Sequence, residues 1–188
     1  MEPKSFNTIH RLLHWNIALC IIVLSGTALF HSTWLGREHL AKIIQENLLL
    51  LCGIQLSFGD ASIIAKRIAQ PMWEWHFYAG YALMGLYILR LIHLAVYGIF
   101  FPNPFNRNTT LKQKVQGITY FLFYLLLGIA ILTGTLMIWG PTAWRWTSQI
   151  IHYQSNYYVL GFILMHFCGI IFTENFIEKG IASKMIHG

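Results

Sequence analysis

Four long apolar runs constrain this 188-residue chain more than any other feature of its sequence. They cover residues 12–30, 77–101, 115–139 and 150–173, and Arg90 is the one formally charged residue within them. About 20 apolar residues in a helix cross ~30 Å of bilayer hydrocarbon, and a helix satisfies its own backbone hydrogen bonds there. We therefore expect one all-α domain over residues 1–188, an integral membrane four-helix bundle of up-down-up-down topology.

The composition agrees with a membrane setting. Only 11% of the residues are charged, 56% are hydrophobic and the mean hydropathy is +0.53, whereas a soluble domain carries about 25% charged residues. Seven Trp residues suit the two membrane interfaces. The net charge is +6, but the Lys and Arg residues form no basic patch interleaved with aromatic residues. Membrane lipid is the predicted partner, and nucleic acid is not.

The segments between the runs are harder to interpret. Residues 31–72 are predicted to form a long outer loop, in which residues 40–58 form an interfacial or partner-facing helix. A fifth span is the alternative, but Gln45, Glu46 and Asn47 interrupt its apolar character. The first run could also be a signal peptide, although it is long for an apolar signal core.

Lys and Arg residues outside the runs predict the orientation. On the side of the termini lie Lys4, Arg11, Arg107, Lys112, Lys114, Lys179 and Lys184, and opposite them lie Arg37, Lys42, Lys66, Arg67 and Arg145. The positive-inside rule then favours cytoplasmic termini. Asn108 to Thr110 are expected to cap the third helix, and Thr147 or Ser148 the fourth.

Histidines inside these runs are the candidate functional residues, because an imidazole within a membrane is costly. His152 and His166 are 14 residues apart, which is about 21 Å of rise and close to four turns of one helix face. His14 begins the first span and His76 the second, at opposite faces of the membrane. The predicted pairs are His76 with His152 near the outer face, and His14 with His166 near the inner face.

Two pairs of imidazoles at two depths are typical of two bis-histidine haems. Iron ligated in this way has no vacant position and is suited to electron transfer rather than oxygen binding. The three cysteines are scattered and no C-x-x-C-H motif is present, so the haems would be non-covalent haem b. Gly80 and Gly134 are predicted to let a flat macrocycle approach a helix, with ordinary helix packing as the alternative.

Several cationic residues and further histidines receive weaker predictions. Arg90 lies 14 residues after His76, so it is predicted to bind an inner haem propionate, with snorkelling to headgroups as the alternative. His93 is expected to face solvent, with a propionate or quinone contact as the alternative. Candidates for outer propionates are Lys66, Arg67 and Arg145. Ordinary surface positions are expected for His10, His31, His39 and His187.

At this point the sequence resembles a known family, the bacterial di-haem b-type cytochromes. These comprise the membrane cytochrome b subunits of nickel–iron hydrogenases, formate dehydrogenase gamma subunits and related stand-alone di-haem cytochromes. The resemblance rests on residues 10–15 (HRLLHW), 25–30 (SGTALF), 75–81 (WHFYAGY), Arg90, 132–135 (LTGT), the His152–His166 spacing and 182–188 (ASKMIHG). The closing residues look more like hydrogenase-type subunits, whereas the outer loop departs from the family pattern.

That resemblance implies a multi-pass protein of the bacterial inner membrane with two haem b groups held by His14, His76, His152 and His166. It also implies an electron-transfer subunit that connects an extracytoplasmic redox partner, hydrogenase-like or dehydrogenase-like, with the quinone pool. The direction of electron flow stays open.

Two other functions remain as alternatives. One is a stand-alone oxidoreductase, such as a superoxide:quinone oxidoreductase, in which Lys66, Arg67 and Arg145 attract an anion. The other is a histidine-based metal transporter, which the spacing disfavours because zinc takes four ligands at one point.

Overall fold

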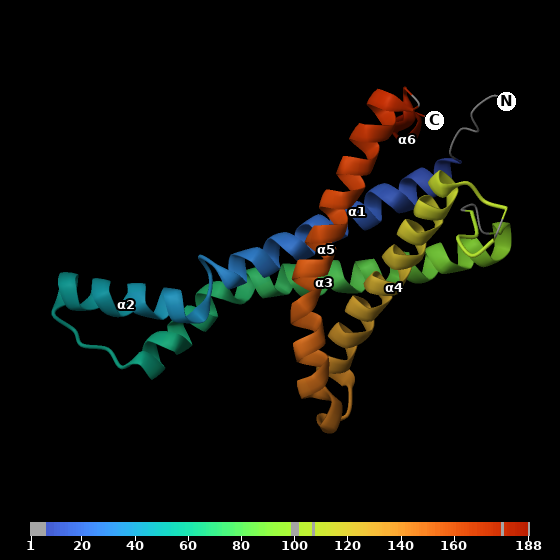
Figure 1. Ribbon diagram of the computed structural model, residues 1–188. Coiled ribbons are helices and arrows are strands. Elements are labelled where there is room, and N and C mark those ends of the chain that lie inside the picture. The colour runs from blue at the N-terminus through green and yellow to red at the C-terminus, as the bar shows by residue number, and fades with distance from the viewer. Residues whose placement is uncertain (1–6, 99–101, 107, 178, 188) are drawn as a thin grey trace. The chain divides into compact units, whose positions relative to one another are not determined.

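The computed structural model describes residues 7–98, 102–106, 108–177 and 179–187, and all of its regular structure there is helical (Figure 1). Lys4 and Arg107, which entered the prediction of orientation, and Phe101 lie outside these residues. The helices are α1 Thr8–Ser32, α2 Arg37–Cys52, α3 Phe58–Tyr97, α4 Leu111–Trp139, α5 Thr142–Phe176 and α6 Ile181–Ile186.

Four of these helices, α1, α3, α4 and α5, are long and apolar enough to cross a membrane. The expectation of an all-α, multi-pass membrane protein with four spanning helices is thus confirmed. The helices run beyond the spans expected from the apolar runs. In particular, α3 has 40 residues and α5 has 35.

The stretch 31–72, expected to be an outer loop that contains a helix, is helical over most of its length. The helix expected at 40–58 instead occupies Arg37–Cys52 and ends where Gly53 adopts a left-handed conformation with φ 67°. The Gly53 and Ile54 amides donate to the carbonyls of Leu49 and Leu48, the pattern of a Schellman C-cap. The chain then re-enters helix at Phe58, so the predicted boundary at residue 58 begins α3.

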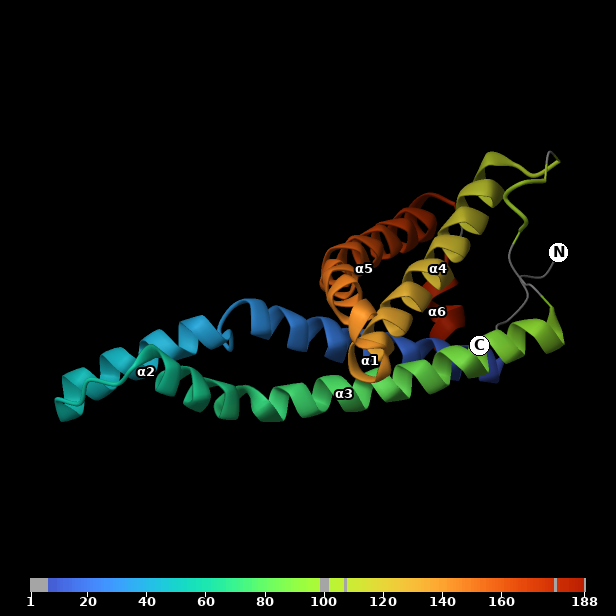
Figure 2. The ribbon, with the colours of Figure 1, turned by 90° about the horizontal axis from the view of Figure 1, so that it is seen from below.

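The chain divides into two compact units, residues 19–82 and the remainder. In the 19–82 unit, α2 and the first turns of α3 run side by side as a helical hairpin (Figure 2). Its core consists of Ala41, Ala61 and Ala65, all fully buried. Small side chains allow two helix backbones to approach closely, and Gln45 Nε2 bridges the helices by donating to the Leu56 carbonyl at 2.8 Å.

In the other unit, α4 and α5 pack together and are joined by Gly140 and Pro141 (Figure 1). Thr110 caps α4 in a capping box with Gln113, within the range predicted for this cap. The predicted cap of α5 is wrong. Helix α5 already begins at Thr142, with Pro141 at its N-cap position. Ser148 is therefore inside the helix, where it is buried.

The C-terminal helix α6 is fastened to α1 and α5 within the same unit. Arg11 Nη1 donates to the Ile186 carbonyl and Trp15 Nε1 to the Met185 carbonyl, both at 3.1 Å. The Glu174 carboxylate accepts hydrogen bonds from the amides of Gly180 and Ala182 at the start of α6. Helix α6 is therefore held against the part of α1 that carries His14.

Candidate functional site

The rings of His14 on α1 and His166 on α5 lie next to each other. Their ring centroids are 6.1 Å apart and their planes are inclined at 48°. A metal–imidazole bond of about 2 Å, with the ring centroid about 1.1 Å further out, separates two rings on opposite sides of one metal by about 6 Å. The spacing of these two rings therefore fits one iron between them, and their role as ligands stays a prediction.

Aromatic side chains surround these two rings. Trp15 meets His14 edge-on at 5.5 Å, and Phe162 stacks on His166 at 6.0 Å with Phe123 behind it. No group of three or more His, Cys, Asp or Glu side chains converges within the described residues. Two neutral nitrogen donors in an apolar setting suit haem, since the porphyrin supplies the other four nitrogens.

Arg90 on α3 lies inside the same unit, with only 7% of its surface exposed. Its Nε donates to the Tyr124 hydroxyl at 3.0 Å, and its Nη1 donates to His10 Nδ1 at 3.0 Å. The expectation that His10 is an ordinary surface residue is thus wrong. His10 precedes His14 by four residues, so both side chains project from one face of α1, and this spacing is a signal that the sequence already contained.

Two other histidines also depart from expectation. His93 was expected to face solvent, but it is 7% exposed and its ring lies 4.8 Å from that of Tyr97. His31 was expected on the surface, but it packs edge-on against Trp73 at 4.8 Å in the 19–82 unit. His39 and His187 are exposed, as predicted.

The ring of His152 is held by α4. Its Nδ1 lies 3.0 Å from the Ala130 carbonyl, which can only accept a hydrogen bond, so Nδ1 carries the hydrogen and Nε2 keeps its lone pair. The Thr133 hydroxyl lies 3.3 Å from the same nitrogen. A Cβ at Gly134 would stand 2.9 Å from His152 Cε1. Gly134 thus makes room for the ring of His152, and its predicted contact with a macrocycle stays a prediction.

His76 is held in a similar way within the 19–82 unit. Its Nδ1 lies 2.8 Å from the Thr27 hydroxyl oxygen, and that hydroxyl is directed at the carbonyls of Val23 and Leu24 at 3.0 and 2.9 Å. When its hydrogen goes to one of these carbonyls, the oxygen can accept from Nδ1–H of His76. Thr27 was not singled out from the sequence, although it lies in one of the quoted motifs. The pairing of His76 with His152 stays a prediction from the sequence.

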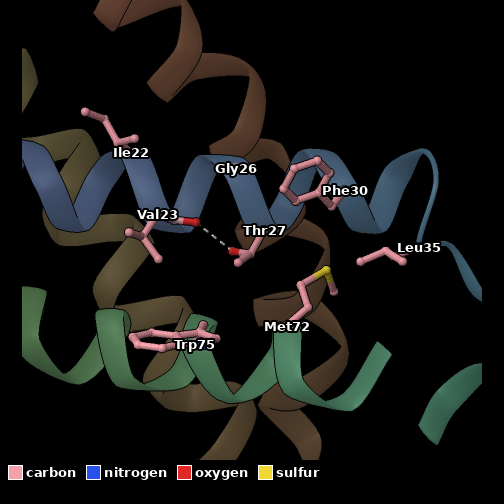
Figure 3. Close-up of a pocket in the computed structure, with 8 residues that line it drawn as sticks. All are labelled: Ile22, Val23, Gly26, Thr27, Phe30, Leu35, Met72 and Trp75. Carbon is pink, nitrogen blue, oxygen red and sulfur yellow. Dashed lines mark hydrogen bonds between the residues drawn. The ribbon is translucent and has the colours of Figure 1, made fainter. Parts of the chain in front are cut away.

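A cleft of about 480 Å³ opens beside Thr27. Its lining is otherwise apolar and comprises Ile22, Val23, Gly26, Phe30, Leu35, Met72 and Trp75 (Figure 3). A Cβ added at Gly26 or at Gly80 would meet nothing within 4 Å. The space beside Thr27, the residue whose hydroxyl lies 2.8 Å from His76 Nδ1, is thus open and apolar, which suits a flat hydrophobic cofactor.

For the cationic residues predicted to bind outer propionates, the structure shows exposure or a main-chain contact. Lys66 and Arg67 are exposed on α3, and Arg145 Nε donates to the Gly140 carbonyl at 3.2 Å.

The chain matches the model of a protein family described as prokaryotic cytochrome b561 over residues 5–188, nearly its whole length. A search of curated proteins and a search of solved structures each found no match.

Proposed function

Because the chain belongs to the prokaryotic cytochrome b561 family, whose members transfer electrons across membranes through haem b, we propose that it holds two haems by four histidines and connects a redox partner with quinone. The observation that carries this proposal is the distance of 6.1 Å between the ring centroids of His14 and His166. His14 and His166 would hold one iron, and His76 and His152 the other. Bound haem supplies an iron that accepts and releases one electron at a time.

The ligand histidines would determine which reactions are open to the protein. Two histidines on each iron would leave no position for oxygen or a substrate. The aromatic rings of Trp15, Phe123 and Phe162 would keep water away from the His14–His166 pair. This arrangement favours electron transfer over oxygen chemistry.

Arg90 is proposed to bind a haem propionate at the His14–His166 pair. A buried guanidinium normally needs an anion, yet its polar partners among the described residues are the neutral Tyr124 and His10. A propionate would supply the missing negative charge and the geometry for a bidentate contact.

Electron exchange with quinone and with an extracytoplasmic redox partner, in the bacterial inner membrane with both termini cytoplasmic, completes the proposal. A feature that supports a protein partner is the apolar end of α2, where Leu50 and Leu51 are 81% and 76% exposed. Exposed apolar patches commonly mark interaction sites, which favours a complex over a stand-alone superoxide:quinone oxidoreductase.

The haem content of purified variants tests this proposal. We expect about two haems per chain in the wild type and about one after His166→Ala, since bis-histidine iron requires both rings. The exposed His39 provides the control, and His39→Ala should keep both haems. A wild-type protein without haem, or a His166→Ala protein with full haem content, would contradict the proposal.

A further inference from the structure

The four candidate ligands differ in what holds the ring nitrogen that faces away from the iron. The Nδ1 atoms of His76 and His152 each lie within hydrogen-bond distance of an oxygen, the Thr27 hydroxyl and the Ala130 carbonyl, and would donate to it as Nδ1–H when Nε2 holds the iron. His14 and His166 make ring contacts, and within the described part of the chain neither donates a hydrogen bond. One predicted pair therefore has two Nδ1–H···O bonds, and the other has none.

Such hydrogen bonds change the electronic character of a metal ligand. An imidazole that donates through Nδ1–H becomes more basic at Nε2 and a stronger donor to the metal. A stronger donor stabilises ferric over ferrous iron and thereby lowers the reduction potential, for which hydrogen bonding around the ligands is a main determinant.

A second observation increases the difference in reduction potential, because it acts on the other pair. Arg90 is buried and lies within electrostatic reach of His14. A positive charge in a low-dielectric setting favours the form that has gained an electron. The potential at the His14–His166 pair should therefore lie higher.

We infer that Thr27 is a positioning residue for His76, and that its hydroxyl, together with the Ala130 carbonyl at His152, makes the His76–His152 haem the lower-potential one. This inference rests on the proposed function, because it assumes that both pairs ligate haem. It also gives the direction that the sequence left open: transfer from the His76–His152 pair toward the His14–His166 pair is downhill.

A redox titration of the purified holoprotein, followed by its visible absorption, tests the inference. Thr27→Val keeps the shape of the side chain but removes the oxygen, so the lower of the two potentials should rise. We expect a threefold to tenfold change in the one-electron equilibrium constant, or about 30–59 mV. Thr27→Ser keeps the hydroxyl and should restore the wild-type value, and Thr27→Cys, with a weaker acceptor, should lie between the two.

The matched control is Thr119→Val, which removes a hydroxyl whose hydrogen bond among the described residues goes to the Val115 carbonyl of its own helix. Its two potentials should equal those of the wild type. If Thr27→Val binds too little haem for titration, the graded comparison of Thr27→Ser with Thr27→Cys decides the matter.

Three results would overturn the inference: an unchanged lower potential in Thr27→Val or Thr27→Cys, a rise in the higher potential instead, or an equal shift in Thr27→Ser. The proposed function fails on a different measurement, the haem content of the wild type and of His166→Ala. A protein with two haems whose potentials ignore Thr27 therefore rejects the inference alone.

Discussion

His152 and His166 lie on the same helix, yet their rings have different surroundings. His152 Nδ1 lies beside oxygen atoms of α4, whereas His166 contacts the rings of Phe162 and His14. Hydrogen bonds fix a tautomer and a ring orientation, while aromatic packing fixes a position and excludes water. One helix thus carries two candidate ligands of the same type whose surroundings give them different chemical properties.

Filling the space beside the His152 ring should have the largest effect on haem binding. Gly134→Ala places a Cβ 2.9 Å from His152 Cε1, so the ring must move from the Ala130 carbonyl. We expect the haem content to fall from about two to about one per chain, measured by pyridine haemochrome absorbance. Gly161→Ala, where a Cβ meets nothing within 4 Å, should keep both haems; equal content in the two variants would refute this role of Gly134.

Arg90→Gln should lower the potential assigned to the His14–His166 pair while leaving the other in place. Loss of a buried positive charge disfavours the reduced iron, and we expect a decrease of roughly 60 mV, equivalent to about 1.4 kcal/mol for one electron. A potentiometric titration measures both values. Arg37→Gln, at an exposed position, is the control, and a decrease of both potentials in Arg90→Gln would contradict a local effect.

The attachment of α6 should affect the stability of the same region. Trp15→Phe keeps an aromatic ring beside His14 but removes the hydrogen bond to the Met185 carbonyl, at a cost of about 0.5–1.5 kcal/mol. We expect haem absorbance to be lost at a lower temperature in a thermal melt. The exposed Trp146 is the control, and an equal decrease in Trp146→Phe would show that the attachment contributes nothing.

The smallest effect is expected at Thr133. Its hydroxyl lies 3.3 Å from His152 Nδ1, further than the Ala130 carbonyl at 3.0 Å, and it donates to the Ile129 carbonyl. Thr133→Val should therefore raise the lower potential by under about 30 mV, less than a threefold change in the one-electron equilibrium constant. A shift as large as that of Thr27→Val would mean that the carbonyl does not dominate at His152.

Much of the fold is predictable from the sequence because the membrane restricts it. The scarcity of charge in four long runs is enough to identify the four spanning helices. The hairpin of α2 and α3 is harder to predict, because its core consists of three alanines whose burial gives no strong apolar signal in the sequence. Its polar surface and the break at Gly53 resemble a loop when read residue by residue.

The candidate site is predictable to the level of residue type but not of environment. Helical spacing is enough to select His14 and His166, whose rings the structure brings together. The same spacing places His10 on the face of α1 that carries His14, and on that face His10 contacts Arg90. No spacing rule identifies a hydrogen bond such as that between Thr27 and His76, which joins residues 49 positions apart.

The oxygen that holds His152 belongs to the main chain. Any residue at position 130 that preserves the helix presents the same carbonyl, so this interaction leaves no trace in the identity of the amino acid there. Drift at position 130 would leave the setting of His152 unchanged, whereas one substitution at Thr27 would alter that of His76. Relatives that differ at residue 27 would then differ in the environment of His76, whereas the environment of His152 would stay the same.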